Sequence, residues 1–113
     1  SDCCERFILG FRHPDTAETL MRSRYTAYNL CDGSYLQKTS AENAKKQSME
    51  RITPIDWMRL KICNIQNGES VDETGAVEFK AFYKENGKIC CLHEVSQFKK
   101  LGGLWFYVGG VIV

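Results

Sequence analysis

The chain has 113 residues, a common size for a single domain, and its 43% hydrophobic, 12% aromatic and 26% charged residues are typical of a globular protein. Its formal net charge of +1 argues against a nucleic-acid binder, which normally carries a strongly basic face. No apolar run approaches the roughly 18 residues that a membrane span needs, and the polar N-terminus lacks the pattern of a secretory signal peptide. We therefore expect a cytoplasmic protein without a nucleic-acid or membrane partner.

An amphipathic helix is the first element that the pattern predicts, over residues 16–31. Asp15 or Thr16 can serve as its N-cap, and Asp15 and Glu18 have the spacing of a capping box. Gly33 follows the last periodic residue, as glycine commonly does after a helix. The chain is therefore expected to begin its folded part with a helix of about four turns.

Two further helical segments are predicted before the sheet. Residues 34–47 are rich in Lys, Asn, Gln and Ser, which favours a polar helical stretch at the surface. Residues 48–57 favour another short turn of helix. That turn is expected to close at Thr53-Pro54, because the residue before a proline disfavours the α conformation.

From Trp57 onward the pattern changes to that of strands. Residues 57–65 and 75–83 alternate between apolar and polar positions, which predicts two half-buried strands. The residues expected on the inward faces are Met58, Leu60 and Ile62 in the first strand and Val77, Phe79, Ala81 and Tyr83 in the second. The second of these faces is uninterrupted and apolar, so a helix must cover it.

A tight turn and two more strands complete the predicted sheet. Asn86-Gly87 is the strongest short hairpin signal, because both residues tolerate positive φ. Strands over residues 88–98 and 104–113 follow, separated by a glycine-containing turn. Helices followed by about four antiparallel strands in a meander predict an α+β fold with the helices packed on one sheet face.

One charged residue interrupts the apolar side of the first helix. Wound at about 100° per residue, the helix places Arg24 at the centre of its apolar stripe and Arg22 on the opposite, solvent-facing side. The other residues of the stripe are Ala17, Leu20, Met21, Ala27, Tyr28 and Cys31. Arginine is almost never fully buried without a partner, so the pattern predicts an internal partner for Arg24.

The strand over residues 88–98 offers a candidate partner. Its period of two puts Leu92, Glu94, Ser96 and Phe98 on one face and Cys91, His93, Val95 and Gln97 on the other. If Leu92 and Phe98 join the apolar face of the neighbouring strand, Glu94 points beneath the helix, and we predict an ion pair between Arg24 and Glu94. His93 then lies on the opposite face and forms no dyad with Glu94. Two interpretations stay open: a structural pair that fixes helix register, or the floor of a ligand pocket.

Six cysteines raise the question of disulfides. They occur as two adjacent pairs, Cys3-Cys4 and Cys90-Cys91, and as single residues within apolar periodic segments, Cys31 and Cys63. Without a secretory signal, reduced thiols are expected. Cys31 and Cys63 are expected to behave as small buried hydrophobes.

Several motifs together resemble those of a known family. "TAETLMRSRYTAY", a tryptophan at 57, "GAVEFKAFY", "HEVSQF" and "LWFYVGG" are similar to the YchJ-like family of small bacterial proteins, over nearly the whole chain. The resemblance implies a cystatin-like cone, the fold of nuclear transport factor 2, in which a curved sheet wraps a long helix and leaves a cavity. It also implies flanking SEC-C zinc motifs, whose pattern is C-x-C followed after about eight residues by Cys-Cys or Cys-His.

Within that resemblance, the N-terminal "CCERFI" looks like the second half of a SEC-C motif. Residues 1–12 would then be the remnant of that motif and residues 13–113 the cone domain. Cys3 and Cys4 would be metal ligands only if the missing first C-x-C were supplied, because a structural zinc site needs four ligands. We therefore expect no cofactor in this chain, and zinc only in a longer form of it.

Two classes of function are consistent with these patterns. The first is a non-catalytic binding or adaptor module for a small ligand or a protein partner. The second is a small-molecule lyase or isomerase that uses the cone cavity, as enzymes of this fold do. The candidate ligand-binding residues are Arg24, Tyr28, Tyr25, Glu94, Ser96, Phe98 and Trp57. No catalytic residue is assigned.

A second copy of the chain is a possible partner. In cones of this fold the open face of the sheet is a common dimer interface. The residues predicted on that face are Lys61, Glu78, Lys80, His93 and Gln97. The residues alone do not decide whether a homodimer forms.

Overall fold

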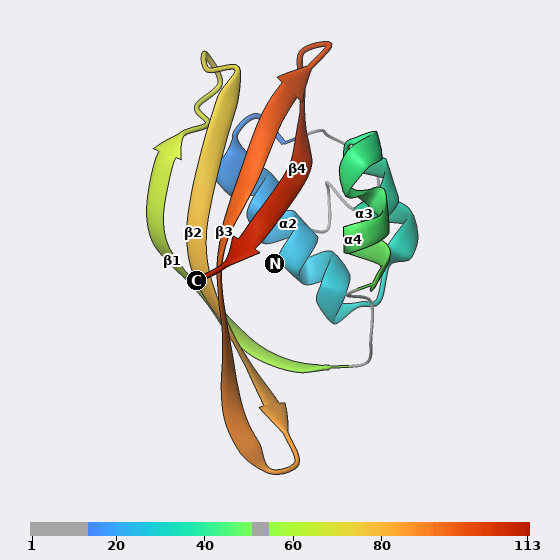
Figure 1. Cartoon of the computed structure of the whole chain (residues 1–113), viewed down its shortest axis with the longest axis vertical. Coiled ribbons are helices and arrows are strands. Elements are labelled where there is room, and N and C mark those ends of the chain that lie inside the picture. Colours follow the sequence, from blue (N-terminus) through green and yellow to red (C-terminus); the bar gives the residue numbers. More distant parts are fainter. Residues whose placement is uncertain (1–13, 51–54) are drawn as a thin grey trace.

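The computed structural model describes residues 14–50 and 55–113, and its sheet is the frame on which the helices lie (Figure 1). The helical part consists of α2 (Ala17–Asn29), α3 (Gly33–Lys38), the 3-10 turn η1 (Glu42–Ala44) and α4 (Lys45–Glu50). The strands are β1 (Asp56–Asn67), β2 (Thr74–Glu85), β3 (Lys88–Leu101) and β4 (Leu104–Ile112). They form one antiparallel sheet in the order β1-β2-β3-β4, which confirms the predicted α+β meander.

Helix α2 lies on the inner face of this sheet (Figure 1). Of the two N-cap candidates, Thr16 is the cap, and its hydroxyl accepts a hydrogen bond from the Thr19 backbone N–H at 3.1 Å. The helix ends at Asn29, two residues earlier than predicted. Cys31 adopts a positive φ of 54° there, and the Asp32 side chain caps the start of α3. Ala17, Leu20 and Met21 of the stripe are buried against the sheet, whereas Ala27 is buried against Tyr35 and Leu36 of α3.

The segment between α2 and the sheet differs from its prediction as a polar surface stretch. It is broken into α3, η1 and α4, because the chain around Ser40 pairs in parallel with Tyr107 of β4. The prediction of a surface position is wrong for five residues of the 34–47 stretch. These are Tyr35, Leu36, Thr39, Ser40 and Ala44, all of them buried. Of the predicted turn over residues 48–57, residues 51–54 lie outside the described part of the chain.

The hairpin between β2 and β3 follows its prediction closely. Asn86 and Gly87 have φ values of 52° and 78°, so both central residues of the turn are left-handed, as a type I′ turn requires. The inner face of β2 carries Val77, Phe79 and Ala81, all buried. Glu94 and Ser96 of β3 pair with Phe79 and Val77 and lie on the same inner face of the sheet. Both are buried, which confirms the predicted inward face of β3.

Strand β1 departs from strict alternation. Its register shifts between Trp57 and Arg59 and again between Ile62 and Asn64. Because a bulge adds one residue to a strand, it exchanges the faces of the residues on its two sides. Met58 is therefore 50% exposed, against the prediction, while Trp57 and Leu60 pack on the core.

The N-cap of α2 gives a first testable expectation. Thr16→Ala should lower the free energy of unfolding by about 1 kcal/mol, because the Thr19 backbone N–H loses its acceptor. Urea unfolding followed by circular dichroism measures the change. Thr26→Ala, the same substitution within α2, serves as the control and should be neutral or slightly stabilising, because alanine is the better helix former. Equal losses in the two variants would contradict the capping role.

Within residues 14–50 and 55–113, no helix combines the length and the apolar composition that crossing a membrane requires.

Candidate ligand-binding site

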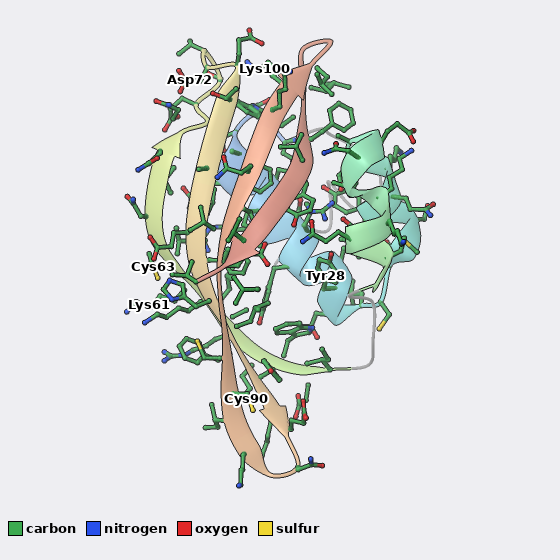
Figure 2. All side chains as sticks on the ribbon, viewed as in Figure 1. Tyr28, Lys61, Cys63, Asp72, Cys90 and Lys100 are labelled. Carbon is green, nitrogen blue, oxygen red and sulfur yellow. The ribbon has the colours of Figure 1, made fainter. Side chains whose placement is uncertain are left out.

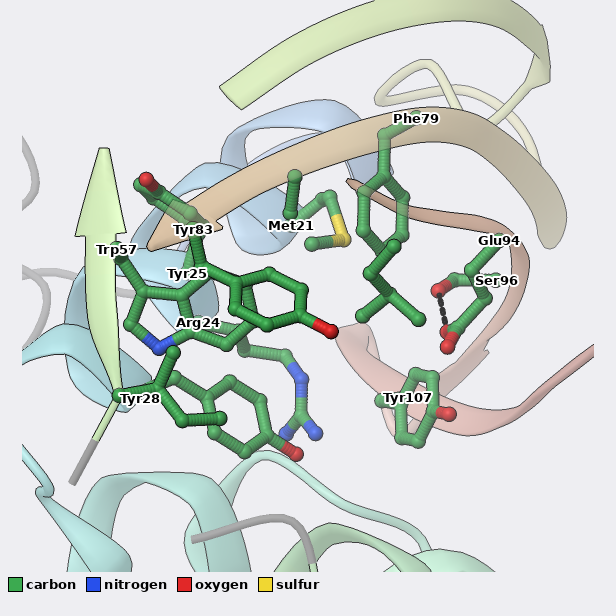
Figure 3. Close-up of a pocket in the computed structure, with 13 residues that line it drawn as sticks. Met21, Arg24, Tyr25, Tyr28, Trp57, Phe79, Tyr83, Glu94, Ser96 and Tyr107 are labelled. Carbon is green, nitrogen blue, oxygen red and sulfur yellow. Dashed lines mark hydrogen bonds between the residues drawn. The ribbon is translucent and has the colours of Figure 1, made fainter. Parts of the chain in front are cut away.

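A cavity of about 250 Å³ lies between α2 and the inner face of the sheet (Figure 3). Helix α2, the start of β1 and the three remaining strands all contribute to its walls. Six aromatic side chains line it, namely Tyr25, Tyr28, Trp57, Phe79, Tyr83 and Tyr107. Most of the wall is therefore apolar, and the charged or strongly polar side chains are confined to a few positions.

Three aromatic rings form a contiguous group at one end of the cavity. The ring of Trp57 meets Tyr25 edge to face with centroids 5.8 Å apart, and it meets Tyr83 in the same manner at 5.4 Å. All three side chains are half-buried, so they line both the cavity and its approach from solvent. Burial raises the pKa of the Tyr25 hydroxyl. The group presents ring faces and edges to a ligand, with tyrosine hydroxyls that stay neutral at physiological pH.

Arg24 occupies a different part of the wall and is only 2% exposed. Its guanidinium connects α2 to the segment that follows, by donating four hydrogen bonds. Nη1 donates to the Leu36 carbonyl at 3.1 Å, to Thr39 Oγ1 at 2.8 Å and to Ser40 Oγ at 3.1 Å. Nη2 donates to Ser48 Oγ at 2.8 Å. All four acceptors are neutral.

Aromatic rings complete the surroundings of the guanidinium. Its central carbon lies 4.4 Å from the ring centroid of Tyr107 and 6.0 Å from that of Tyr28, both within cation–π range. Burial lowers the pKa of Arg24, and the neighbouring tyrosines act in the opposite direction. Arg24 is therefore a buried cation whose charge is stabilised by dipoles and ring faces.

The predicted ion pair between Arg24 and Glu94 is wrong. No carboxylate of the described residues lies within ion-pair distance of the Arg24 guanidinium, which binds the hydroxyls of residues 39, 40 and 48 instead. Glu94, 1% exposed, accepts a hydrogen bond from Ser96 Oγ at 2.6 Å. Figure 3 shows this Glu94–Ser96 pair at the opposite end of the cavity from Trp57 and Tyr28. Both charged residues line one cavity, but each has its own partners.

The structure brings together six of the seven candidate ligand-binding residues. Arg24, Tyr25, Tyr28, Trp57, Glu94 and Ser96 all line the cavity. Phe98 does not, because it is buried in the core with its ring 5.8 Å from that of Tyr107. A role of these residues in ligand binding stays a prediction.

The hydroxyl acceptors of Arg24 were missed by the sequence reasoning. Leu36, Thr39 and Ser40 have the spacing of one helix face, which could have indicated that the two hydroxyls point inward with the leucine. No comparable pattern marks Ser48, which lies 24 positions from Arg24 in the chain.

A comparison with protein-family models identifies the chain. Residues 16–110 match the model of the YchJ middle NTF2-like domain. The chain belongs to the YchJ-like family. This confirms the family resemblance, and the NTF2-like description of the matched domain agrees with the helix-on-sheet architecture described above.

Relatives in the YchJ-like family are found among several bacteria. A UPF0225 protein of Geobacter sulfurreducens is 35% identical, over 96% of this chain and 71% of its own length. A UPF0225 protein of Streptomyces coelicolor is 36% identical, over 96% of this chain and 84% of its own. The name UPF0225 states no activity, so these relatives establish the family and leave the function to be argued from the site.

Two solved structures extend the likeness from sequence to fold. The solution structure of a SEC-C motif containing protein from Rhodopseudomonas palustris has a TM-score of 0.86 and 30% identity, covering 99% of this chain and 90% of that one. A crystal structure of a SEC-C motif containing protein from Psychrobacter arcticus has a TM-score of 0.80 and 27% identity, covering 99% and 71%. Both agree with the cone fold that the YchJ-like resemblance implied.

The cysteines differ from their predictions in this YchJ-like chain. The structure describes four of them, and none of these four is part of a disulfide. Cys31 and Cys63 are exposed, however, so their prediction as buried hydrophobes is wrong. Cys31 lies in the left-handed turn after α2, and Cys63 lies at the second register shift of β1 and points away from the helices with Lys61 (Figure 2). Cys3 and Cys4, with the proposed motif over residues 1–12, lie outside the described residues.

The outer face of the sheet carries a separate polar pair. His93 Nε2 lies 2.7 Å from Glu78 Oε2, across neighbouring strands β3 and β2. His93 therefore faces away from the cavity, which confirms that it forms no dyad with Glu94. In the described part of the chain, no group of three or more His, Cys, Asp and Glu side chains is arranged to hold a metal ion.

Proposed function

We propose that this YchJ-like domain is a non-catalytic binding module whose cavity takes a small, mainly apolar molecule. The observation that carries the proposal is the cavity of about 250 Å³ with its six aromatic residues and few polar groups. An apolar cavity of about 150 Å³ holds benzene, and typical ligand pockets begin at about 300 Å³. A molecule of one or two rings is the size that fits.

The contacts of the polar side chains favour binding over catalysis. Arg24 is held by four hydrogen bonds, and Glu94 already accepts one from Ser96. The lyase or isomerase alternative needs an acid and a base that converge on one reacting atom. His93 is on the other face of the sheet, and the raised pKa of Tyr25 makes that hydroxyl a poorer proton donor at neutral pH.

The binding proposal predicts that a bulkier side chain in the cavity blocks a ring-shaped probe. Ala81 lines the cavity and is buried, so Ala81→Met fills part of the space. Each CH₂-sized part of the ligand that can no longer be buried costs about 0.8 kcal/mol of binding free energy. The Kd for indole should therefore rise about tenfold or more. The measurement is a titration of ¹⁵N-labelled protein with indole, followed by NMR shifts of the backbone and of the Trp57 indole N–H.

Ala76→Met is the matched control for this titration. Ala76 lies on the same strand but on the outer face, where it lines a small surface pocket away from the main cavity. Indole affinity in this variant should equal that of the wild type. The proposal fails if indole causes no localised shifts in the wild type, or if the two methionine variants bind indole equally well.

A further inference from the structure

The charge of Arg24 is not balanced by a carboxylate in the part of the chain that the structure describes. Its four hydrogen-bond acceptors are a carbonyl and three hydroxyls, and the rings of Tyr28 and Tyr107 lie beside it. A buried charge of this kind is costly even when hydrogen-bonded, and an anion supplies the interaction that neutral dipoles replace only in part. The cavity beside Arg24 has room for such an anion.

One edge of the guanidinium is also left outside these hydrogen bonds. Arginine has five N–H groups, of which Nη1 uses its two on three acceptors and Nη2 uses one on Ser48. Nε–H takes part in none of these four hydrogen bonds, and the Tyr28 hydroxyl also lies close enough to interact with the guanidinium. The open space next to Arg24 is the cavity, which Tyr28 also lines.

The rest of the wall selects the kind of anion. A phosphate or sulfate presents several oxygens that each need a donor, whereas a carboxylate is satisfied by one or two N–H groups. Arg24 is the cation among the residues that line the cavity, and the carboxyl group of Glu94 lies at the Ser96 end (Figure 3), so an anionic group is directed toward Arg24. The aromatic group around Trp57 offers an apolar surface for the remainder of the molecule.

We propose that the ligand is a small aromatic or alicyclic carboxylate, with its carboxylate on Arg24 Nε–H and its ring among the aromatic side chains of the cavity. This rests on the proposed function and specifies the class of ligand. Arg24 then has two roles: its Nη1 and Nη2 atoms hold residues 36–48 against α2, and its remaining edge binds the ligand.

Three probes of similar shape test the class of ligand on the wild-type protein. These are 3-phenylpropanoate, its uncharged amide and neutral indole, each titrated by NMR at pH 7. A charge-assisted hydrogen bond to the buried guanidinium should make the carboxylate bind about 10- to 100-fold more tightly than the amide. The Arg24 Nε–H resonance should shift on addition of the carboxylate and not of the amide.

Two variants of α2 locate the preference. Arg24→Gln removes the charge while keeping an amide that can donate to the neighbouring hydroxyls, and it should abolish the preference for the carboxylate over the amide. Arg22→Gln, a matched change at the exposed arginine two residues away, should leave the preference intact. A preference that survives Arg24→Gln would overturn the inference.

The probes also separate this inference from the proposal on which it rests. If indole and both phenyl compounds fail to bind the wild type, the binding function itself is refuted. If indole binds but the carboxylate binds no more tightly than the amide, the cavity is a binding site and the carboxylate class is wrong. The comparison uses wild-type protein, so it decides the question even if Arg24→Gln does not fold.

Discussion

Arg24→Met is expected to lower the free energy of unfolding by about 3–4 kcal/mol, which is among the larger losses for a single substitution. Methionine fills similar space but donates no hydrogen bond. The loss follows because Arg24 donates hydrogen bonds from α2 to four residues of the segment between α2 and the sheet. Those acceptors are buried, so water cannot replace the guanidinium without entering the core.

The measurement is equilibrium urea unfolding followed by circular dichroism, with Arg22→Met as the control. Arg22 lies on the exposed face of the same helix and pairs with Glu18 at 2.9 Å. Surface pairs of this kind are worth about 0–1 kcal/mol, so the control should lose no more than that. A similar loss in both variants would show that any methionine in α2 has this cost, and that the buried contacts of Arg24 are not its source.

A double-mutant cycle distinguishes the observed partner of Arg24 from the one predicted by strand periodicity. Arg24→Met combined with Ser48→Ala should show a coupling energy of about 1.5–3 kcal/mol, because Nη2 donates directly to Ser48 Oγ. The same cycle with Glu94→Gln should show a smaller coupling, because no direct contact joins the two side chains. A larger coupling energy with Glu94 than with Ser48 would contradict the observed hydrogen bond and favour the predicted ion pair between Arg24 and Glu94.

The difference between those two partners shows what local patterns can and cannot predict. Helical periodicity correctly places Arg24 on the buried face of α2, and strand alternation correctly places Glu94 inside the sheet. Neither pattern contains a distance between the two side chains. The acceptors come instead from a segment of broken helices, where the spacing of Leu36, Thr39 and Ser40 does not extend to Ser48 in the separate helix α4. The candidate site was predictable as a set of residues, and its contacts were not.

The strands show the same distinction between local and non-local information. The Asn86-Gly87 turn and the inward face of β2 follow from residue types that act within a few positions. The exposure of Met58 does not, because it depends on a bulge in β1. The regular alternation of apolar residues in the sequence of that strand gives no sign of the bulge. Phe98 shares a strand face with Glu94 yet lies in the core outside the cavity, because a common face does not fix the position along the strand.

A second large loss of stability is expected where α2 begins on the edge of the sheet. Gly68, at the end of β1 with φ of +80°, accepts a hydrogen bond from the Ala17 backbone N–H at 2.9 Å and donates one to the Thr74 carbonyl at 3.0 Å. A Cβ at Gly75 would lie 2.5 Å from the Gly68 Cα, 2.8 Å from its nitrogen and 3.2 Å from the Ala17 Cβ. Three residues without bulky side chains thus let the first turn of the helix approach the β1–β2 connection.

Gly75→Ala should therefore lower the free energy of unfolding by about 3 kcal/mol, the upper part of the range for overpacking. The added methyl group would overlap backbone atoms of Gly68. These atoms can move only if the hydrogen bond between Ala17 and Gly68 is disturbed. Gly87→Ala is the control: its φ is +78° but nothing lies within 4 Å of the added Cβ, so it should cost only about 1 kcal/mol of left-handed strain. Urea unfolding of both variants measures the two losses. If Gly75→Ala lost no more than Gly87→Ala, the β1–β2 connection would have to yield easily, and the start of α2, which holds Arg24 at the cavity, would not be fixed by this contact.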